Sequence, residues 1–487
     1  MPLRPYYREQ VWLLPPSLGE LIPSDHPARF VAAFIDGLDS VRWLEMGIAE
    51  AGDELGAPAY HPRALLSVWL YGFMTGIRSA RKLETACRDQ LPYLWLTGWQ
   101  QPDHNTLWRF YKANREGMRR LFKRTVRTAV RVGLVDLAVQ AVDGSKIAGN
   151  ASRDRSHDEK GLVKLLERTE VAIRELEAQN ESGAGPKLCR LPAELVHAQA
   201  LREQVEKALQ EIKTEDSPSR INLTDRDARI LKSRHGVIAG YNAQAMVSPL
   251  QEEVAGGGGL FITALGITNQ PDDHGQLVPM IEAAREMTGT EVALTLADGG
   301  YHSGATLAQC EEQQIKVLMP EAQKEELKDP YHKEHFPYDP QTDSYTCPQG
   351  QKLDFRRKGQ CRDRPDKRIY QAKAANCRAC PAFGQCTKDR HHGRKLEVSV
   401  YEDQLKRQRA LMATEEAKSI YGRRKELPEP VFGILKESLG ARRFLLRGLA
   451  NVLSEWLLLG TAFNLRSLWR VWQSWSPDRR WLLTRIA

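Results

Sequence analysis

Two short motifs in this sequence place an aspartate and a glycine directly after an apolar run. The apolar run 135–142 ends inside the motif AVDG at 141–144, and the run 292–297 ends inside the motif LADGG at 296–300. Apolar runs of this length predict buried strands, and an acid after such a strand lies where open α/β sheets bind ligands. The glycine lets a backbone or a substrate approach closely. Asp143 and Asp298 are therefore the first candidates for chemistry.

These two carboxylates would repel each other at neutral pH if their strands were neighbours. A divalent cation between them removes the repulsion, and carboxylate oxygens are ligands that Mg²⁺ binds in proteins. A single Asp-Gly pair is more often an ordinary turn. Two such pairs after buried strands, in a chain of net charge +8, favour a Mg²⁺ site formed by Asp143 and Asp298.

A cluster of cysteines is a second set of candidate metal ligands. Five of the eight cysteines lie between 347 and 386. Cys377 and Cys380 have the spacing of a zinc-binding thiolate pair, and Cys347 and Cys386 complete four ligands. Reduced free thiols are the alternative interpretation. A Zn²⁺ ion here would be structural, because the segment has too little apolar content to fold unaided. Rival ligands are Cys361, His391 and His392.

Composition and length restrict the class of protein. The chain has 487 residues, of which 41% are hydrophobic and 27% charged, as in soluble globular proteins of two to four domains. No run reaches the roughly 18 apolar residues of a membrane span, and the N-terminus lacks the apolar core of a signal peptide. We therefore expect a cytoplasmic protein without membrane contact, whose clustered cysteines favour metal over disulfides.

The first 134 residues predict a helical domain, with helices at 61–78 and 107–132. Residues 101–135 carry nine Lys and Arg against two acids. Five of these bases recur three and four residues apart on one helix, which favours contact with DNA phosphates. A solvated helix face packed on its neighbours is the alternative. The basic stripe consists of Lys112, Arg115, Arg119, Lys123 and Arg127.

The elements that must position the two aspartates predict an α/β domain with a mixed sheet. Its first part is 135–157, and it continues over 221–325. Between them, 158–220 predicts an inserted hairpin of two heptad-patterned helices. Residues 326–400 form the Cys-rich insertion, and 401–487 are helical. The expected strands are 135–142, 241–247, 260–268, 292–297 and 315–319, and the expected helices of this part are 271–287 and 305–313.

A third acid is sought in the stretch YGRRKELPEPVFGILK at 421–436. Pro428 and Pro430 flank Glu429, and proline fits the first turn of a helix. The helix is expected to start near Pro428, with Glu429 in its first turn, where the helix dipole favours an ionised carboxylate. Lys436 lies two turns further along the same face. Glu426 precedes the helix and is expected to be an exposed partner of its basic neighbours.

Together these stretches resemble the DDE transposases of bacterial insertion sequences. Many members carry the signature Tyr-x2-Arg-x3-Glu-x6-Lys, and this chain has Tyr421, Arg424, Glu429 and Lys436. The gap between Arg424 and Glu429 holds four residues instead of three; Lys425 would restore it but shift the tyrosine spacing, so both bases stay open for the arginine role. Seven stretches similar to the family occur in order: HPRALLSVWLYGF, PDHNTLWRF, AVDGSKI, GYNAQA, ADGGYHS, EPVFGILK and RRFLLRGLANV.

The resemblance implies a ribonuclease H-like catalytic domain whose triad is Asp143, Asp298 and Glu429. In the family this triad holds two Mg²⁺ (or Mn²⁺) ions, which activate the attacking oxygen and stabilise the leaving oxygen of a phosphoryl transfer. The expected function is binding of the element's terminal inverted repeats, followed by strand cleavage and strand transfer. The implied partners are double-stranded DNA, in the nucleoid, and further copies of the chain, at least as a dimer.

Two other functions stay open on the sequence. One is a transposase-derived protein that binds DNA without cutting it, although all three acids are present. The other is a metal-dependent hydrolase of a different phosphoester, against which the basic stripe argues.

Overall fold

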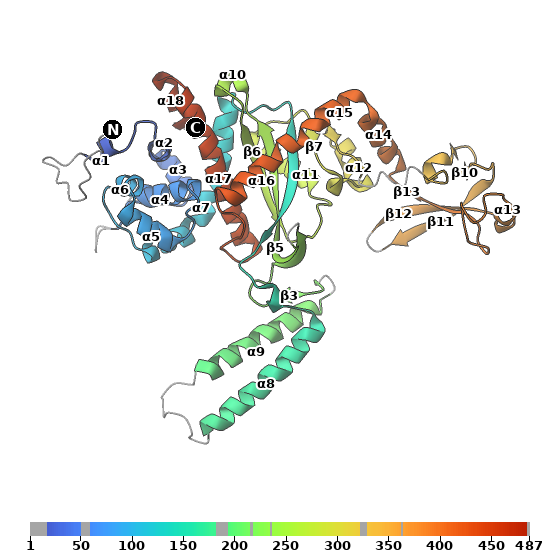
Figure 1. The fold of residues 1–487 in the computed structure, drawn as a ribbon, viewed down its shortest axis with the longest axis horizontal. Helices are drawn as coiled ribbons and strands as arrows, with labels where there is room; N and C mark the ends of the chain where they lie inside the picture. Colours follow the sequence, from blue (N-terminus) through green and yellow to red (C-terminus); the bar gives the residue numbers. More distant parts are fainter. Residues whose placement is uncertain are drawn as a thin grey trace, which may run out of the picture.

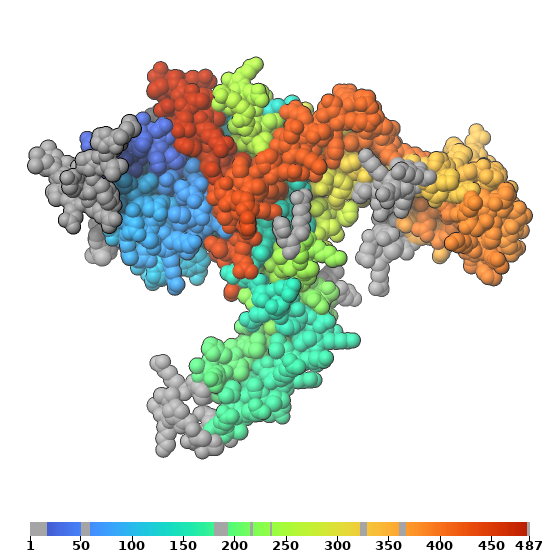
Figure 2. Space-filling model, viewed as in Figure 1, coloured from blue at the N-terminus to red at the C-terminus, as the bar shows by residue number. Residues whose placement is uncertain are grey.

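The chain folds into an α/β body from which two smaller units project (Figure 1). The computed structural model describes residues 17–49, 59–181, 193–214, 218–233, 236–321, 329–361 and 364–484. The space-filling view shows a helical arm below the body and a second unit beside it (Figure 2). The arm holds the described residues of 159–212, and the second unit holds those of 338–399.

The body is built on a six-stranded mixed sheet of order β4-β5-β1-β7-β8, in which β6 also pairs with β5. Strand β1 is antiparallel to β5 and parallel to β7, and β7 is parallel to β8. The expected mixed α/β architecture is confirmed. The strands are β1 (Gln140–Ala148), β4 (Arg229–Ser233), β5 (Gly236–Pro249), β6 (Leu260–Thr268), β7 (Thr295–Leu296) and β8 (Val317–Leu318).

Asp143 lies inside a strand, whereas the sequence predicted a strand over 135–142 that ends before it. Strand β1 begins at Gln140 and continues to Ala148, because all of it from Ala141 pairs with the long strand β5. On its other edge, β7 pairs only with Gln140 and Ala141. Asp143 therefore lies in a stretch of this edge that has no strand partner, between Ala141 and the bridge of Ala148 with Arg443.

Helices cover both faces of the sheet. One apolar core joins Ala141 and Ile147 of β1 to α7, α16 and α17, and a second core joins Val142 to α11 and α12. Since strand residues alternate between faces, Asp143 and Ser145 face α16. The helices are α7 (His104–Arg131), α11 (Leu277–Thr288), α12 (Gly304–Glu312), α14 (Glu402–Ala413), α15 (Glu415–Gly422), α16 (Pro428–Glu437), α17 (Leu449–Ser474) and α18 (Pro477–Thr484).

The helical N-terminal part packs on the body through α17. This helix is buried along most of its length and lies between the sheet and the N-terminal helices (Figure 1). The Asn464 amide exchanges two 2.9 Å hydrogen bonds with the backbone of Ile262 on β6. No helix in the described ranges could span a membrane. The N-terminal helices before α7 are α1 (Leu18–Leu21), α2 (Pro27–Asp36), α3 (Ser40–Glu45), α4 (Pro62–Met74), α5 (Ala80–Asp89) and α6 (Leu91–Thr97).

Each projecting unit has a small core of its own. In the arm, Leu162 of α8 (Glu159–Glu181) packs with Val205 of α9 (Ala193–Ile212). The other unit is a five-stranded antiparallel sheet around Leu353 and Tyr370, of order β13-β12-β11-β10-β9. Its elements are β9 (Tyr338–Asp339), β10 (Ser344–Thr346), β11 (Lys352–Cys361), β12 (Arg364–Ala372), α13 (Ala374–Arg378) and β13 (Lys395–Ser399).

A buried ion pair ties the N-terminal helices to α17. Arg78 Nη1 lies 2.7 Å from Glu455 Oε1, and the two side chains are 7% and 2% exposed. Glu455 also accepts hydrogen bonds from the backbone N–H groups of Leu445 and Leu446. The carboxylate therefore has a full set of partners in a dry interface.

Replacing Arg78 by Met leaves the buried Glu455 carboxylate without its cation. We expect the free energy of unfolding, measured by chemical denaturation, to fall by about 3–5 kcal/mol. Arg88→Met is the matched control, because its 2.6 Å contact with Glu84 is a helix-surface pair with a half-exposed guanidinium. That variant should lose less than about 1 kcal/mol. Equal losses in the two variants would contradict the special role of the buried pair.

Candidate active site

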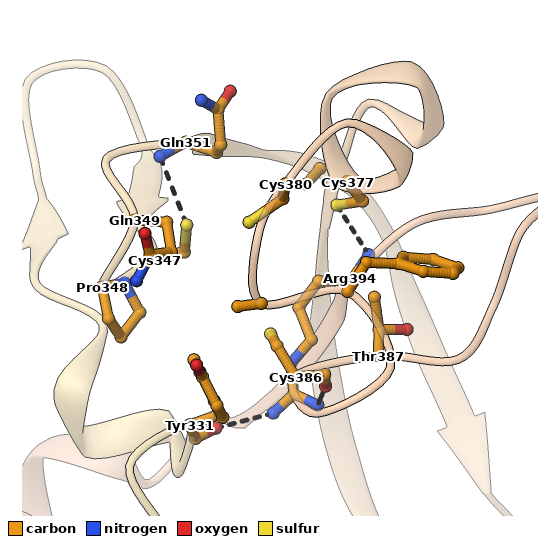
Figure 3. Close-up of a pocket in the computed structure, with 13 residues that line it drawn as sticks. Tyr331, Cys347, Pro348, Gln349, Gln351, Cys377, Cys380, Cys386, Thr387 and Arg394 are labelled. Carbon is orange, nitrogen blue, oxygen red and sulfur yellow. Dashed lines mark hydrogen bonds between the residues drawn. The ribbon is translucent and has the colours of Figure 1, made fainter.

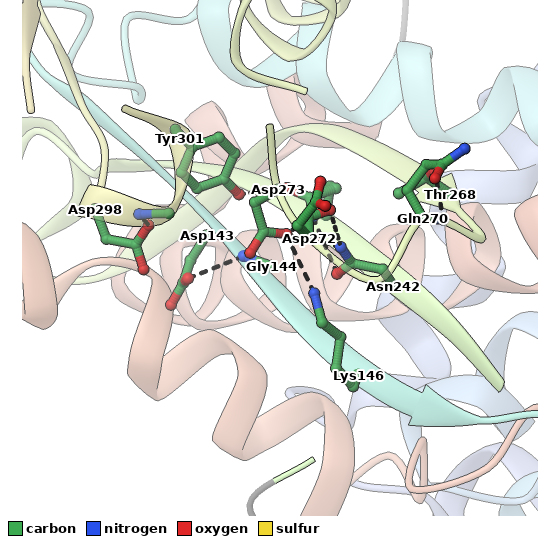
Figure 4. Close-up of polar contacts among 12 residues, drawn as sticks. Asp143, Gly144, Lys146, Asn242, Thr268, Gln270, Asp272, Asp273, Asp298 and Tyr301 are labelled. Atoms are coloured by element: carbon green, nitrogen blue, oxygen red, sulfur yellow. Dashed lines mark hydrogen bonds and ion pairs between the residues drawn. The ribbon is translucent and has the colours of Figure 1, made fainter. Parts of the chain in front are cut away.

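The two predicted aspartates come together at the open edge of β1. One guanidinium bridges them: Arg424 Nη1 lies 3.8 Å from Asp143 Oδ2, and Arg424 Nη2 lies 3.9 Å from Asp298 Oδ2. Asp298 follows β7 and begins the short helix η2 (Gly299–Tyr301), whose Gly300 N–H donates to Asp298 Oδ1 at 2.8 Å. Figure 4 shows the two carboxylates side by side.

Burial makes the charge on Asp143 costly. Desolvation raises the pKa of Asp143 to about 6, Arg424 opposes this rise, and the nearby Asp298 adds to it. The side chains of Asp143 and Asp298 are 20% and 36% exposed. This is a site whose negative charges need a positive partner, and in the structure that partner is Arg424.

The two candidates for the signature arginine have different surroundings. Arg424 is buried in the 3-10 helix η5 (Arg423–Glu426), and its Nη1 atom has no hydrogen-bond partner in the described part of the chain. Lys425 is exposed. Tyr421 is half-buried beside Arg424; desolvation raises the pKa of its hydroxyl, and the positive charge of Arg424 opposes the rise. The geometry favours Arg424 over Lys425.

Glu429 stands in the first turn of α16, as the sequence predicted. The ammonium of Lys436 contacts Ser145 Oγ at 2.5 Å, and Arg443 further on forms a parallel bridge with Ala148. The chain from Glu429 therefore runs along β1 in the same direction. Glu429 lies two helical turns before Lys436, about 10 Å along α16, toward the end of β1 that carries Asp143. It is exposed, and in the described ranges no hydrogen bond or ion pair joins it to either aspartate.

A further carboxylate, Asp273, lies near Asp143 on the side away from Asp298 (Figure 4). Its Oδ1 atom accepts hydrogen bonds of 2.7 Å from both Asn242 and Gln244, and Lys146 approaches it at 3.4 Å. The sequence predicted a helix over 271–287, and for that reason Asp273 was not among the predicted site residues. Helix α11 begins only at Leu277, so Asp273 sits in the preceding loop and reaches β1. The signal was the QPDD sequence, whose proline and aspartates are typical of a turn.

Asp273 explains the glycine after Asp143, and the Asp298 side chain itself restricts Gly300. A Cβ added to Gly144 would lie 2.5 Å from Asp273 Oδ1 and would also collide with Gln244 Nε2. A Cβ on Gly300 would lie 2.9 Å from Asp298 Oδ1 and 3.6 Å from Asp273 Oδ2. The glycines thus make room for a polar network, rather than for a turn alone.

The four predicted zinc ligands line one cavity in the five-stranded unit. Cys347, Cys377, Cys380 and Cys386 surround a space of about 20 Å³ (Figure 3), which suits a single water-sized occupant. Backbone N–H groups of Gln351 and Arg394 donate to the sulfurs of Cys347 and Cys377 at 3.2 and 3.3 Å. The alternative ligands His391 and His392 are exposed and do not line this cavity. The side chain of Cys361 is outside the described residues.

Neither set of predicted metal ligands is closed around an ion position. The described residues include no group of three or more His, Cys, Asp or Glu side chains close enough to hold a metal ion. The aspartates form a pair, and the four thiols stand around a cavity without the close convergence of bound ligands.

Comparison with known families identifies both ends of the chain. Residues 346–469 match the family described as transposase DDE domain, and residues 16–113 match a transposase domain (DUF772). Both matches support a DDE transposase of an insertion sequence. The first match contains Tyr421, Arg424, Glu429 and Lys436, and it ends inside α17. No curated protein and no solved structure matches the transposase.

The basic stripe of this transposase is largely occupied by contacts inside the molecule. Arg119 donates to Ser454 Oγ at 2.7 Å, Lys123 pairs with Glu286 at 2.8 Å, and Arg127 donates to the carbonyl of Glu286 at 3.4 Å. Lys112 is exposed and Arg115 is partly exposed. The stripe thus joins α7 to α17 and α11, and only its first turns remain open to a partner.

Alanine at Gly144 tests the packing of the Asp273 network. We expect Gly144→Ala to lower the free energy of unfolding by about 1–3 kcal/mol, because the new methyl group overpacks the Asp273 and Gln244 side chains. Thermal unfolding measures the effect. Gly422→Ala is the control, since a Cβ there meets nothing within 4 Å. A Gly144→Ala protein as stable as the control would refute this explanation of the glycine.

Proposed function

We propose that this transposase binds the inverted repeats at the ends of its element and catalyses metal-dependent DNA cleavage and strand transfer. One observation carries the proposal. Asp143 and Asp298 come from two adjacent parallel strands, and Arg424, from the segment that holds the Tyr-Arg-Glu-Lys signature, bridges them. Residues from three distant parts of the chain converge on one exposed edge of the sheet.

The sheet topology supports a ribonuclease H-like catalytic domain. Three antiparallel strands, β6-β5-β1, are followed by two parallel ones, β7 and β8. Asp143 belongs to the central strand of this order and Asp298 to the space after its parallel neighbour. The resemblance stated from the sequence predicts the same arrangement, with the 326–400 segment as an insertion between the second and third acids.

The donor set fits Mg²⁺ or Mn²⁺. Mg²⁺ is commonly held by one or two carboxylates together with substrate phosphates and water, rather than by a complete protein cage. Asp143 and Asp298 provide two such carboxylates, both close to Arg424. When bound, two such ions would supply Lewis acidity to the attacking and leaving oxygens of a phosphoryl transfer. Asp143 and Asp298 would hold them, and Glu429 would add a ligand from α16.

The other signature residues have positions suited to handling the DNA backbone. Lys436 stands over Ser145, two residues along β1 from Asp143, where its ammonium can hold a phosphate next to the cleaved one. Arg424 keeps both aspartates compensated until cations replace it, and its planar guanidinium is then available to a phosphate. Tyr421 is half-buried beside Arg424.

The N-terminal helices are the proposed reader of the terminal repeats. Lys112 and Arg115 are the stripe residues with exposed surface, and they would contact phosphates while Arg119, Lys123 and Arg127 fix α7 to the catalytic body. Joining two element ends in one complex requires at least two copies of the chain, so we propose a dimer or larger assembly on DNA.

A structural Zn²⁺ in the Cys-rich unit is part of the proposal. Its support is the single cavity lined by Cys347, Cys377, Cys380 and Cys386. The two N–H···S hydrogen bonds there favour thiolates over thiols, as the outer hydrogen bonds of metal ligands do. Burial raises the pKa of Cys386, and the Arg394 guanidinium opposes this; a zinc ion would lower that pKa.

Cleavage of a duplex that carries the element's end, in the presence of Mg²⁺, tests the catalytic assignment. Asp298→Asn and Glu429→Gln should each lose cleavage by at least about a hundredfold while duplex binding persists. Glu426→Gln is the matched control, because Glu426 is an exposed acid three residues from Glu429. Loss of cleavage in Glu426→Gln with activity kept in Glu429→Gln would overturn the third acid. A wild-type chain that binds the end without cutting would favour the DNA-binding relic.

Metal analysis of purified protein tests the zinc site. We expect about one zinc per chain and its loss from the Cys377→Ser/Cys380→Ser double variant. Cys310→Ala is the control: Cys310 is a buried thiol of the main body and should leave the zinc content unchanged. Protein expressed with adequate zinc that carries none, or a double variant that keeps its metal, would contradict the assignment.

A further inference from the structure

A basic groove opens at the far end of the strand that carries Asp143. Its volume is about 500 Å³, and Arg153, Arg443 and Arg447 line it together with Asn150 and Ser152. Asp154 is the one acidic residue in the lining. We call this cavity the arginine groove. None of its arginines belongs to the Tyr-Arg-Glu-Lys signature or to the basic stripe of α7.

The groove is held in shape by contacts to the backbone, and its charges are not neutralised. The Phe444 N–H donates to the carbonyl of Ala148 at 2.9 Å, and the Asn150 amide donates to the carbonyl of Leu445 at 2.8 Å. These contacts join the end of β1 to the segment before α17. The site therefore exists before any ligand binds.

The three arginines differ in how they are held, but each keeps free donors. Within the described ranges, the Arg443 guanidinium makes no hydrogen bond or ion pair. Arg447 uses only its Nε–H, which donates to the carbonyl of Asn150 at 3.0 Å. Arg153 faces Asp154 at 3.5 Å, with both side chains more than half exposed, so that pair is weak. Arginine's planar fork matches phosphate oxygens bidentately.

Along β1, the arginine groove lies beyond the aspartates and beyond the position of Lys436. Ala148 is five residues beyond Asp143 on β1, about 17 Å at the usual strand rise. Ser145, which contacts Lys436, lies between them. Duplex DNA rises 3.4 Å per base pair, so the groove is about five base pairs from a phosphate held at Asp143 and Asp298. A straight duplex on this face would meet Lys436 first and the arginine groove next.

We propose that the arginine groove is a second DNA contact, which binds the sugar–phosphate backbone about five base pairs from the cleaved phosphate. The inference rests on the proposed transposase function and adds a binding site to it. The guanidinium groups and the hydroxyl of Ser152 are its donors, and a contact to phosphates carries no sequence information directly. The bound DNA can be an element end or the target, since their backbones are chemically the same.

The test measures duplex binding by Arg443→Gln and by Arg443→Gln/Arg447→Gln over a range of salt concentrations. Each lost phosphate contact should make the slope of log affinity against log salt shallower by about 0.9, hence about 1.8 for the double variant. Arg442→Gln is the matched control, because this neighbouring arginine is already paired with Glu437 outside the groove. The Arg443 side chain has no internal partner to lose, so its single variant should fold normally.

Hydroxyl-radical footprinting on the end duplex assigns the source of the DNA. Protection lost about five base pairs from the cleavage site assigns the groove to the element end; an intact footprint with reduced strand transfer assigns it to the target. If wild-type protein binds and cleaves DNA while the Arg443 variants keep its slope, the groove inference fails alone. If wild-type protein does not bind DNA at all, the proposed function fails with it.

Discussion

The repulsion between Asp143 and Asp298 is the constraint on which the rest of this structure depends. Two carboxylates at one sheet edge, one of them buried enough to have a pKa of about 6, are unfavourable without a cation. Arg424 supplies that charge at 3.8 and 3.9 Å, too far for tight hydrogen-bonded pairs. Arg424 therefore compensates the two charges without binding either carboxylate in a tight ion pair.

The surrounding elements hold this pair from two sides. On the α16 side, the signature segment brings Arg424 and Lys436 to β1. On the α11 side, Asp273 and its three donors fill the space beside Gly144. Because residues alternate along β1, Asp143 and Ser145 face α16, whereas Gly144 and Lys146 face the α11 side. A register shift of one residue in β1 would exchange these sets and destroy the site.

The sequence predicted the parts of this arrangement that local pattern determines. The mixed sheet, strand β6, the start of α16 at Pro428 and the convergence of Asp143 with Asp298 all follow from periodicity, proline placement and the strand–acid pattern. The extent of β1 does not, because its residues after Asp143 become a strand only by pairing with β5. Asp273 was missed for a related reason: its role comes from a loop that folds back across the sheet, and no local period records that.

The basic stripe shows that the charges along one helix do not by themselves predict a DNA-binding surface. Its spacing on α7 is regular, yet Arg119, Lys123 and Arg127 meet α17 and α11, elements that lie more than 150 residues away in the chain. Arg443 and Arg447 are the opposite case. They lie in no regular stripe, and the parallel bridge between Ala148 and Arg443 brings them to the end of the strand that carries Asp143. A positive charge is available to DNA only where the fold leaves it without an internal acceptor. By that criterion the arginine groove is better suited to binding DNA phosphates than the basic stripe of α7.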